Sequence, residues 1–349
     1  MSRMYVQFIK CTKITISDFI LQFDSERAAE AAAGKVHLST VMQQQTLSVW
    51  EEESVQKCGR GQHCNCTVKE WESCCFLALT THCQGIGHGC RSKAEFILPG
   101  EFERIGADKK ALDVLGVGSG GGEVDVQMLS LLQSVFPAVP ITADIVEGSS
   151  QLTNNFKALV AKTANLQKIP FTWHVMHSGD YEKQVKAKAD MKRFDFIHMI
   201  QMIYYVDNLA ETIKFYHSVL KTNGRLMIII ETANGGWDTL WKTFQKELCV
   251  DAITQYRSSA EVIACLKSQG LKYEEHIIHN TFDITECFDP SSTTGGRLLN
   301  FLTAKDDFHQ SFTQEIRAGI LDLLRNKCST EKDGRVFFNS DLSCILVHA

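Results

Sequence analysis

A glycine cluster near the middle of the chain has the residue types that hold a nucleoside or a nucleotide. The cluster, residues 118–122 (GSGGG), follows a short apolar run at 111–117 and precedes a segment, 123–136, with apolar side chains at helical spacing. Small residues let a ligand approach the backbone, and the first turn of a helix presents free N–H groups to it. The segment therefore predicts a ligand site where a strand meets a helix.

The glycine spacing alone fits two classes of cofactor. Gly116, Gly118 and Gly121 satisfy G-x-G-x-x-G, the dinucleotide fingerprint. Gly118, Gly120 and Gly122 satisfy G-x-G-x-G, which suits S-adenosylmethionine. Either match is weak by itself, so the spacing leaves the cofactor open.

An acidic residue strengthens the nucleoside interpretation. Glu147 follows a second apolar run at 141–146 (ITADIV). A carboxylate at that strand end can accept hydrogen bonds from both ribose hydroxyls in either cofactor class. The alternative is an ordinary exposed glutamate, and its placement favours the ribose role.

Short apolar runs alternate with helical segments through the middle of the chain. Such alternation predicts βαβ units and an α/β fold with a parallel sheet covered on both faces. The expected strands are 111–117, 141–146, 171–176, 194–200 and 225–230, and the expected helices are 123–136, 149–166, 180–191 and 208–220. Ser149 is a plausible N-cap, and His198, inside an apolar strand, is interpreted as a core histidine.

The end of the chain has a different pattern. Two longer strands are expected at 273–284 and 335–347, with helices at 298–302 and 314–327 between them. The last strand contains a polar interruption, Asn339-Ser340-Asp341, which predicts a hairpin or a bulge. A dehydrogenase would need more parallel strands here, so the long terminal strands favour a methyltransferase.

Composition limits the class of protein. The chain has 349 residues, 44% hydrophobic and 22% charged, with a net charge of −5. This is a globular composition, and the charge argues against a surface for nucleic acid. No apolar run reaches the roughly 18 residues of a membrane span, and the N-terminus does not read as a secretory signal. We expect an intracellular enzyme that binds neither nucleic acid nor membrane.

Residues 1–93 do not follow the regular pattern. Eight of the 13 cysteines lie before residue 91, yet no C-x2-C pair of the kind typical of zinc sites is present, so no metal is expected. We therefore expect two parts: residues 1–93, a cysteine-rich segment that is disordered or comes from an incorrect gene model, and residues 94–349, the catalytic domain.

Several longer stretches carry a family resemblance. They are Leu98-Pro99-Gly100, Arg104-Ile105-Gly106, 118–125 (GSGGGEVD), Val146-Glu147, 159–166 (LVAKTANL), 195–205 (DFIHMIQMIYY), 236–241 (GWDTLW), 270–274 (GLKYE) and Phe301-Leu302-Thr303. In these stretches, residues from about 98 to 349 resemble the histamine N-methyltransferases, which are class I S-adenosylmethionine-dependent enzymes.

The resemblance implies a fold, a cofactor and a site. The fold would be a seven-stranded, mostly parallel Rossmann-like sheet with an antiparallel last strand and a small substrate-binding region. S-adenosylmethionine would be held by Gly118, Gly120, Glu147, Gln151, Leu152, Ser178 and Ile200. The substrate amine would be held by Gln201, Tyr204, Tyr205, Trp241, Phe301, Asn339 and Ser340. A cytoplasmic monomer is the family expectation.

The residue types suit methylation of the histamine ring. The transfer is an in-line displacement from a sulfonium, which requires mainly that an unprotonated ring nitrogen be positioned against the methyl carbon. Imidazole is substantially neutral near pH 7, so no strong base and no catalytic residue are required. Aromatic rings can enclose the flat substrate and face its cationic amine.

The chain departs from the family at three places. The family's N-terminal glutamate, which holds the amine, should fall shortly before Leu98, but residues 83–88 (CQGIGH) contain no carboxylate. Losing that contact would cost about 1.5–3 kcal/mol. Ser340 stands where the family has a second asparagine, and Leu152 where it has a glutamine, with Gln151 adjacent. Three functions therefore compete: histamine methylation, methylation of another small amine, and non-catalytic cofactor binding.

Overall fold

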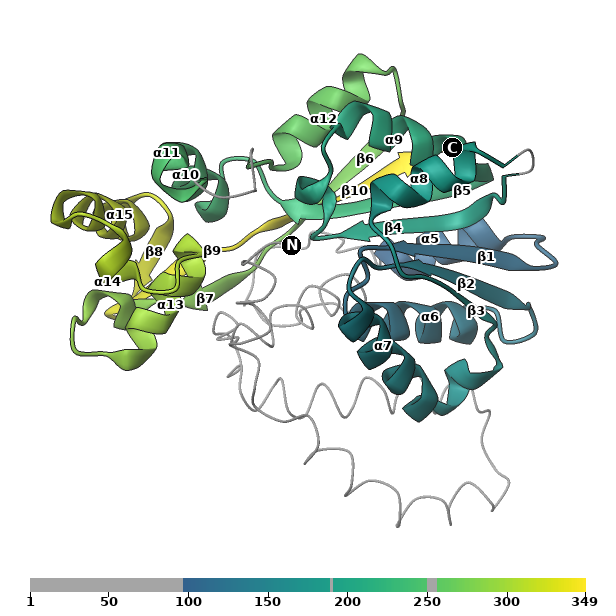
Figure 1. Cartoon of the computed structure of the whole chain (residues 1–349), viewed down its shortest axis with the longest axis horizontal. Coiled ribbons are helices and arrows are strands. Elements are labelled where there is room, and N and C mark those ends of the chain that lie inside the picture. Colours follow the sequence, from purple (N-terminus) through teal and green to yellow (C-terminus); the bar gives the residue numbers. More distant parts are fainter. Residues whose placement is uncertain (1–96, 189–190, 250–255) are drawn as a thin grey trace, which may run out of the picture.

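A seven-stranded sheet forms the centre of the computed structural model, which describes residues 97–188, 191–249 and 256–349. The strand order is β3-β2-β1-β4-β5-β10-β6 (Figure 1). The strands are β1 (Leu112–Val117), β2 (Ile141–Val146), β3 (Phe171–His174), β4 (Phe194–Ile200), β5 (Leu220–Glu231), β6 (Tyr273–Ile278) and β10 (Leu342–His348). Strand β10 pairs antiparallel with both β5 and β6, and the other strand pairs of this sheet are parallel. The predicted α/β fold is confirmed.

Helices cover both faces of this sheet (Figure 1). One face packs against α5 (Ile97–Gly106), α6 (Glu123–Val135) and α7 (Ser150–Lys162), followed by the 3-10 turn η2 (Ala164–Lys168). The other packs against α8 (Ser178–Lys186), α9 (Leu209–Ser218) and α12 (Ser259–Ser268), with the turn η3 (Ile203–Tyr205) after β4. Strand β5 is buried on both sides: Met227 and Ile229 join the first core, and Ile228 and Ile230 join the second. A continuous apolar run is the expected pattern for such a strand.

A smaller unit lies beside the large sheet (Figure 1). Its sheet has the order β7-β9-β8, formed by β7 (Thr281–Asp283), β8 (Ser329–Lys332) and β9 (Arg335–Asn339). A third core joins it to α10 (Gly236–Thr243), α11 (Gln245–Leu248), η4 (Thr285–Phe288), α13 (Thr293–Thr303), α14 (Phe308–Ser311) and α15 (Gln314–Asn326).

The two long terminal strands predicted from the sequence are each divided between the two sheets. Residues 273–284 form β6 and β7, and residues 335–347 form β9 and β10. The polar residues at the division bind each other: the Ser340 N–H donates to the Asn280 carbonyl (2.9 Å), and the Asn280 N–H donates to Asp341 Oδ1 (2.9 Å). The interruption is therefore neither a hairpin nor a bulge but a crossing from one sheet to the other.

Two helix predictions also need correction. The helix expected at 180–191 spans Ser178–Lys186 and buries Tyr181 and Val185 against the sheet, so it is not wholly exposed. The helix expected at 298–302 is the second half of α13. The segment 1–93 and its cysteines lie outside the described residues. Within the described part of the chain, no helix is long and apolar enough to cross a membrane.

The central position of β10 makes a stability prediction. Ile345 is fully buried between β5 and β6, whereas Ile277 on β6 is 43% exposed. We predict that Ile345→Ala lowers the free energy of unfolding by about 2–5 kcal/mol, because it leaves a cavity. Ile277→Ala is the matched control and should change it by less than about 0.5 kcal/mol. Urea denaturation measures both, and equal losses would contradict the burial seen here.

Candidate active site

The glycine loop after β1 adopts a conformation that favours glycine at every second position. Gly118, Gly120 and Gly122 have φ values of +70°, +58° and +82°, in the left-handed region. A Cβ at Gly118 would lie 2.7 Å from Met202 Cβ, and one at Gly122 would lie 2.1 Å from the Phe156 ring. The three positions with left-handed backbone match the G-x-G-x-G spacing, and this match favours the S-adenosylmethionine alternative.

The Glu147 carboxylate joins this loop to the end of β2. Glu147 is 8% exposed. Its Oε2 accepts a hydrogen bond from the Gly120 N–H (2.9 Å), and its Oε1 accepts one from the Ser149 N–H (2.8 Å). Each carboxylate oxygen has a second lone pair, so the group can still accept from two ribose hydroxyls. The loop and the acid therefore fit a nucleoside cofactor together.

A buried pair that the sequence did not reveal supports the loop. Asp125 at the start of α6 is 3% exposed, and its Oδ1 accepts from the Ser119 hydroxyl at 2.8 Å. The same oxygen lies 3.2 Å from His198 Nε2, and His198 is 2% exposed on β4. His198 is thus a partnered core histidine, as predicted. The role of Asp125 could not be predicted from the sequence, because its spacing is the same as that of an ordinary exposed acid on a helix.

The other predicted cofactor residues lie at the carboxyl ends of neighbouring strands. Ile200 ends β4, and Ser178 begins α8 after β3. Leu152 in the first turn of α7 is 7% exposed, whereas Gln151 is exposed and donates to Asn155 (3.1 Å). Parallel strands place their carboxyl ends at one edge, so these residues share the edge that carries Glu147.

Gln201, which follows β4, has an unusual backbone. Its φ is +51°, in the left-handed region that side-chain-bearing residues rarely adopt. Its N–H donates to the Ile229 carbonyl of β5 (3.0 Å), and its Oε1 accepts from the Tyr204 hydroxyl (2.7 Å). Its Nε2 is buried and has no hydrogen-bond partner among the described residues. Backbone strain of this kind clusters at ligand sites.

The predicted aromatic substrate residues lie in close contacts with other rings or with backbone carbonyls. The ring centroids of Tyr204 and Tyr205 are 4.8 Å apart, and those of Trp237 and Phe301 are 5.4 Å apart. Trp241 is buried, and its Nε1 donates to the Leu302 carbonyl (3.1 Å), so this donor is already used within the fold. Trp237, which the sequence pattern assigned to core packing and not to the site, has a buried Nε1 without a partner in the described part of the chain.

The polar pair between β9 and β10 divides its roles. Asn339 Oδ1 accepts from the Asp341 N–H (2.9 Å) and so stabilises the crossing. Ser340 is fully buried, and its hydroxyl has no hydrogen-bond partner among the residues described. Ser340 therefore has hydrogen-bonding capacity left for a ligand.

Glu231 is a buried acid that the sequence analysis missed. It ends β5, pairs in register with Leu342 of β10 and is 8% exposed. Its Oε2 has no hydrogen-bond partner, and within the described ranges no cation forms an ion pair with it. Burial, together with the nearby Asp238 carboxylate, raises the pKa of Glu231 to about 7. In the sequence, Glu231 could have been noticed as an acidic residue that directly follows the apolar run at 225–230.

Residues 256–259, at the start of α12 and just before it, form hydrogen bonds with the segments that follow β4 and β5. The Arg257 guanidinium donates to the carbonyls of Ile203 (3.1 Å) and Val206 (2.6 Å), and the Ser259 hydroxyl accepts from the Ala233 N–H (3.0 Å). Tyr256 is thereby placed beside both strand ends. Its ring stacks on Trp241 at 5.9 Å, and its buried hydroxyl has no partner among the described residues. Burial and the nearby carboxylates, Glu231 first among them, raise the pKa of Tyr256.

Comparison with known proteins agrees with this architecture. A family model described as a methyltransferase domain matches residues 91–276. Histamine N-methyltransferase A from Xenopus laevis is 42% identical over 275 residues, which cover 78% of this chain and 92% of that protein. Histamine N-methyltransferase from Bos taurus is 39% identical (72% and 87% covered), and carnosine N-methyltransferase 2 from Gallus gallus is 39% identical (72% and 79% covered).

The sheet order, the glycine loop and the matching domain define a class I S-adenosylmethionine-dependent methyltransferase. Within that class, the identity to these relatives over most of the chain places it in the histamine N-methyltransferase family.

The bridging role of Glu147 makes a prediction for cofactor affinity. We predict that Glu147→Ala weakens S-adenosylmethionine binding by about 100-fold or more, because two charge-assisted hydrogen bonds and the anchor of the glycine loop are lost. Isothermal titration calorimetry measures the affinity. Glu331→Ala, which removes an exposed acid on β8, is the control and should bind normally. Unchanged binding by Glu147→Ala would contradict the assignment.

The burial of Glu231 makes a prediction for the pH dependence of stability. An acid whose pKa rises from 4.5 to about 7 on folding favours the folded state at low pH, and that contribution is lost as pH rises between these values. Relative to wild type, Glu231→Gln should therefore gain about 3 kcal/mol of stability from pH 4 to pH 8. Urea denaturation across this range measures the gain, and a difference independent of pH would contradict it.

Proposed function

We propose that the protein transfers the methyl group of S-adenosylmethionine to an imidazole ring nitrogen of histamine, which inactivates the amine. The observation that carries the proposal is Gln201, held in a strained conformation by Tyr204 and β5 with its amide nitrogen still unpartnered. A neutral amide can orient an imidazole without adding charge. Family membership supports this substrate, because the relatives' names specify histamine.

We assign the cofactor to the edge formed by β1, β2 and β4. When bound, S-adenosylmethionine supplies an electrophilic methyl group on a sulfonium. Gly118 and Gly120 allow its close approach, and Glu147 accepts its ribose hydroxyls. The remaining contacts come from Gln151, Leu152, Ser178 and Ile200.

The proposed substrate residues follow β4, which neighbours β1 in the sheet, or belong to the smaller unit. Tyr204, Tyr205 and Phe301 enclose the ring, and Ser340 offers a buried hydroxyl. Trp241 and Asn339 support this pocket through packing and through the crossing between the sheets. No residue acts as a catalytic base: the chain positions a neutral imidazole, and the proton leaves the methylated ring after the transfer.

A second candidate is methylation of a different imidazole amine. Carnosine N-methyltransferase 2 is as similar to this chain as several histamine enzymes are, and Ser340 is shorter than the family's asparagine. The position of the family's N-terminal glutamate falls outside the described residues. We further propose a monomeric, cytoplasmic protein whose catalytic domain spans residues 94–349.

A methyl-transfer assay tests the function directly. The purified 349-residue chain is incubated with labelled S-adenosylmethionine and with histamine, carnosine or other small amines, and Glu147→Ala is the negative control. Labelled methylhistamine that disappears in the variant supports the proposal. Turnover of carnosine alone favours the second candidate. Cofactor binding without any product would leave the non-catalytic alternative.

The same assay tests the role of Gln201. We predict that Gln201→Ala lowers kcat/KM for histamine by about 10- to 100-fold, because the ring loses its orienting hydrogen bond. Cofactor affinity should stay unchanged, since Gln201 is assigned to the substrate. Gln314→Ala, at an exposed site in α15, is the matched control. Equal activity of the two variants would contradict the assignment.

A further inference from the structure

Three neighbouring strands are flanked, at the same end of the sheet, by polar groups that lack hydrogen-bond partners among the described residues. β4, β5 and β10 are adjacent in the sheet, and they lead to Gln201 Nε2, Glu231 Oε2 and Ser340 Oγ. The strand register brings the three residues near one another. Gln201 directly follows Ile200, which pairs with Ile229, two residues before Glu231. Ser340 lies two residues before Leu342, which pairs with Glu231 itself. All three atoms are buried and unpartnered among the described residues. Buried polar groups are normally hydrogen-bonded, so a cluster of unpartnered ones points to a ligand.

Glu231 differs from the other two because it can carry a charge. An ionised carboxylate in a buried site costs several kcal/mol unless a cation or several hydrogen bonds compensate it. Here a backbone N–H hydrogen bond offsets only part of the cost, Oε2 has no partner among the described residues, and burial raises the pKa of Glu231 to about 7. A residue that destabilises its own strand in the free protein is typical of a binding group.

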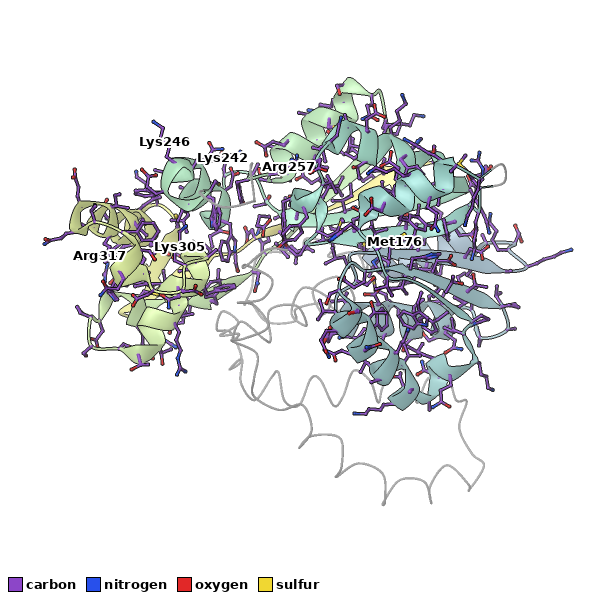
Figure 2. The ribbon with its side chains drawn as sticks, viewed as in Figure 1. Met176, Lys242, Lys246, Arg257, Lys305 and Arg317 are labelled. Carbon is purple, nitrogen blue, oxygen red and sulfur yellow. The ribbon has the colours of Figure 1, made fainter. Side chains whose placement is uncertain are left out.

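The neighbouring charges are already satisfied. Asp238 Oδ2 accepts from the Asn234 N–H (2.9 Å), and its Oδ1 lies 2.9 Å from Lys242 Nζ. Lys242 also lies 3.0 Å from Glu261. Lys242 belongs to α10 and Arg257 precedes α12 (both labelled in Figure 2), and the Arg257 guanidinium is occupied by backbone carbonyls. Neither cation therefore forms an ion pair with Glu231, and no other cation does so within the ranges that the structure describes.

We propose that Glu231 binds the ammonium group of the substrate and so selects imidazole compounds that carry a cationic side chain. This inference rests on the proposed function, since it assigns a specificity residue to the same site. The surroundings suit a cation: Tyr256 lies near Glu231, its ring stacks on Trp241, and the faces of aromatic rings attract ammonium groups. An imidazole compound with a neutral side chain would leave the carboxylate uncompensated.

Binding of a matched pair of ligands tests the proposal without turnover. Histamine and its alcohol analogue, 4-(2-hydroxyethyl)imidazole, differ only in the charged group of the tail. Calorimetry is performed on the full chain saturated with S-adenosylhomocysteine. Wild type should bind histamine more tightly than the alcohol. Glu231→Gln should lose about 10- to 100-fold in histamine affinity and change alcohol affinity by less than about threefold.

Two further variants separate the charge of Glu231 from its packing. Glu231→Asp keeps the charge and should retain part of the preference for histamine. Glu247→Gln removes an acid from the nearby helix α11 and should bind like wild type. A Glu231→Gln variant that keeps the wild-type preference, or that loses both ligands equally, would overturn the proposal. Charge-dependent histamine binding without methyl transfer would instead retain this inference and refute the proposed function.

Discussion

The proposed cofactor site depends on one carboxylate, that of Glu147. Glu147 accepts from backbone N–H groups on both sides, Gly120 after β1 and Ser149 before α7, and thereby joins two loops that are distant in sequence. This bridge requires that β1 and β2 end at the same level, which their parallel register from Leu112↔Ile141 to Val117↔Val146 ensures. It also requires left-handed glycines, because a side chain at Gly122 would collide with Phe156. Sheet register, loop conformation and charge therefore form one interdependent unit.

The proposed substrate site has the opposite character, because several of its buried polar groups lack partners among the described residues. Gln201 is strained, Ser340 is buried without a partner, and Glu231 has no counter-charge among the described residues. Each of these costs stability in the free protein. The surrounding cores, fully packed around Ile230, Leu240 and Ile345, provide the stability that lets such a site persist. A ligand that forms hydrogen bonds with the three groups gains this free energy on binding. Because the site is already preorganised, little binding free energy is lost to rearrangement.

The sequence predicted the features that depend on local patterns. It did not predict those that depend on contacts between residues far apart in the sequence. The strands at Leu112–Val117 and Ile141–Val146 follow from short apolar runs, and the glycine loop follows from its composition. The division of 273–284 and 335–347 between two sheets could not be predicted, because it depends on hydrogen bonds between Asn280 and residues 340–341. Glu231 was missed for a related reason: its isolation depends on β10 and the segment at Tyr256, which are far away in sequence.

The double crossing between the sheets has a consequence for how this fold can diverge. The chain leaves the large sheet at Ile278 and returns at Leu342, and these two residues pair directly across β6 and β10. Everything between them, including Phe301 and Ser340, is thus an insertion whose two ends already meet in an antiparallel ladder. Such an insertion can be exchanged, shortened or replaced by a tight turn while the ladder remains closed. Selection can then rebuild the region around an amine as a module, while the strands that carry the glycine loop keep their register.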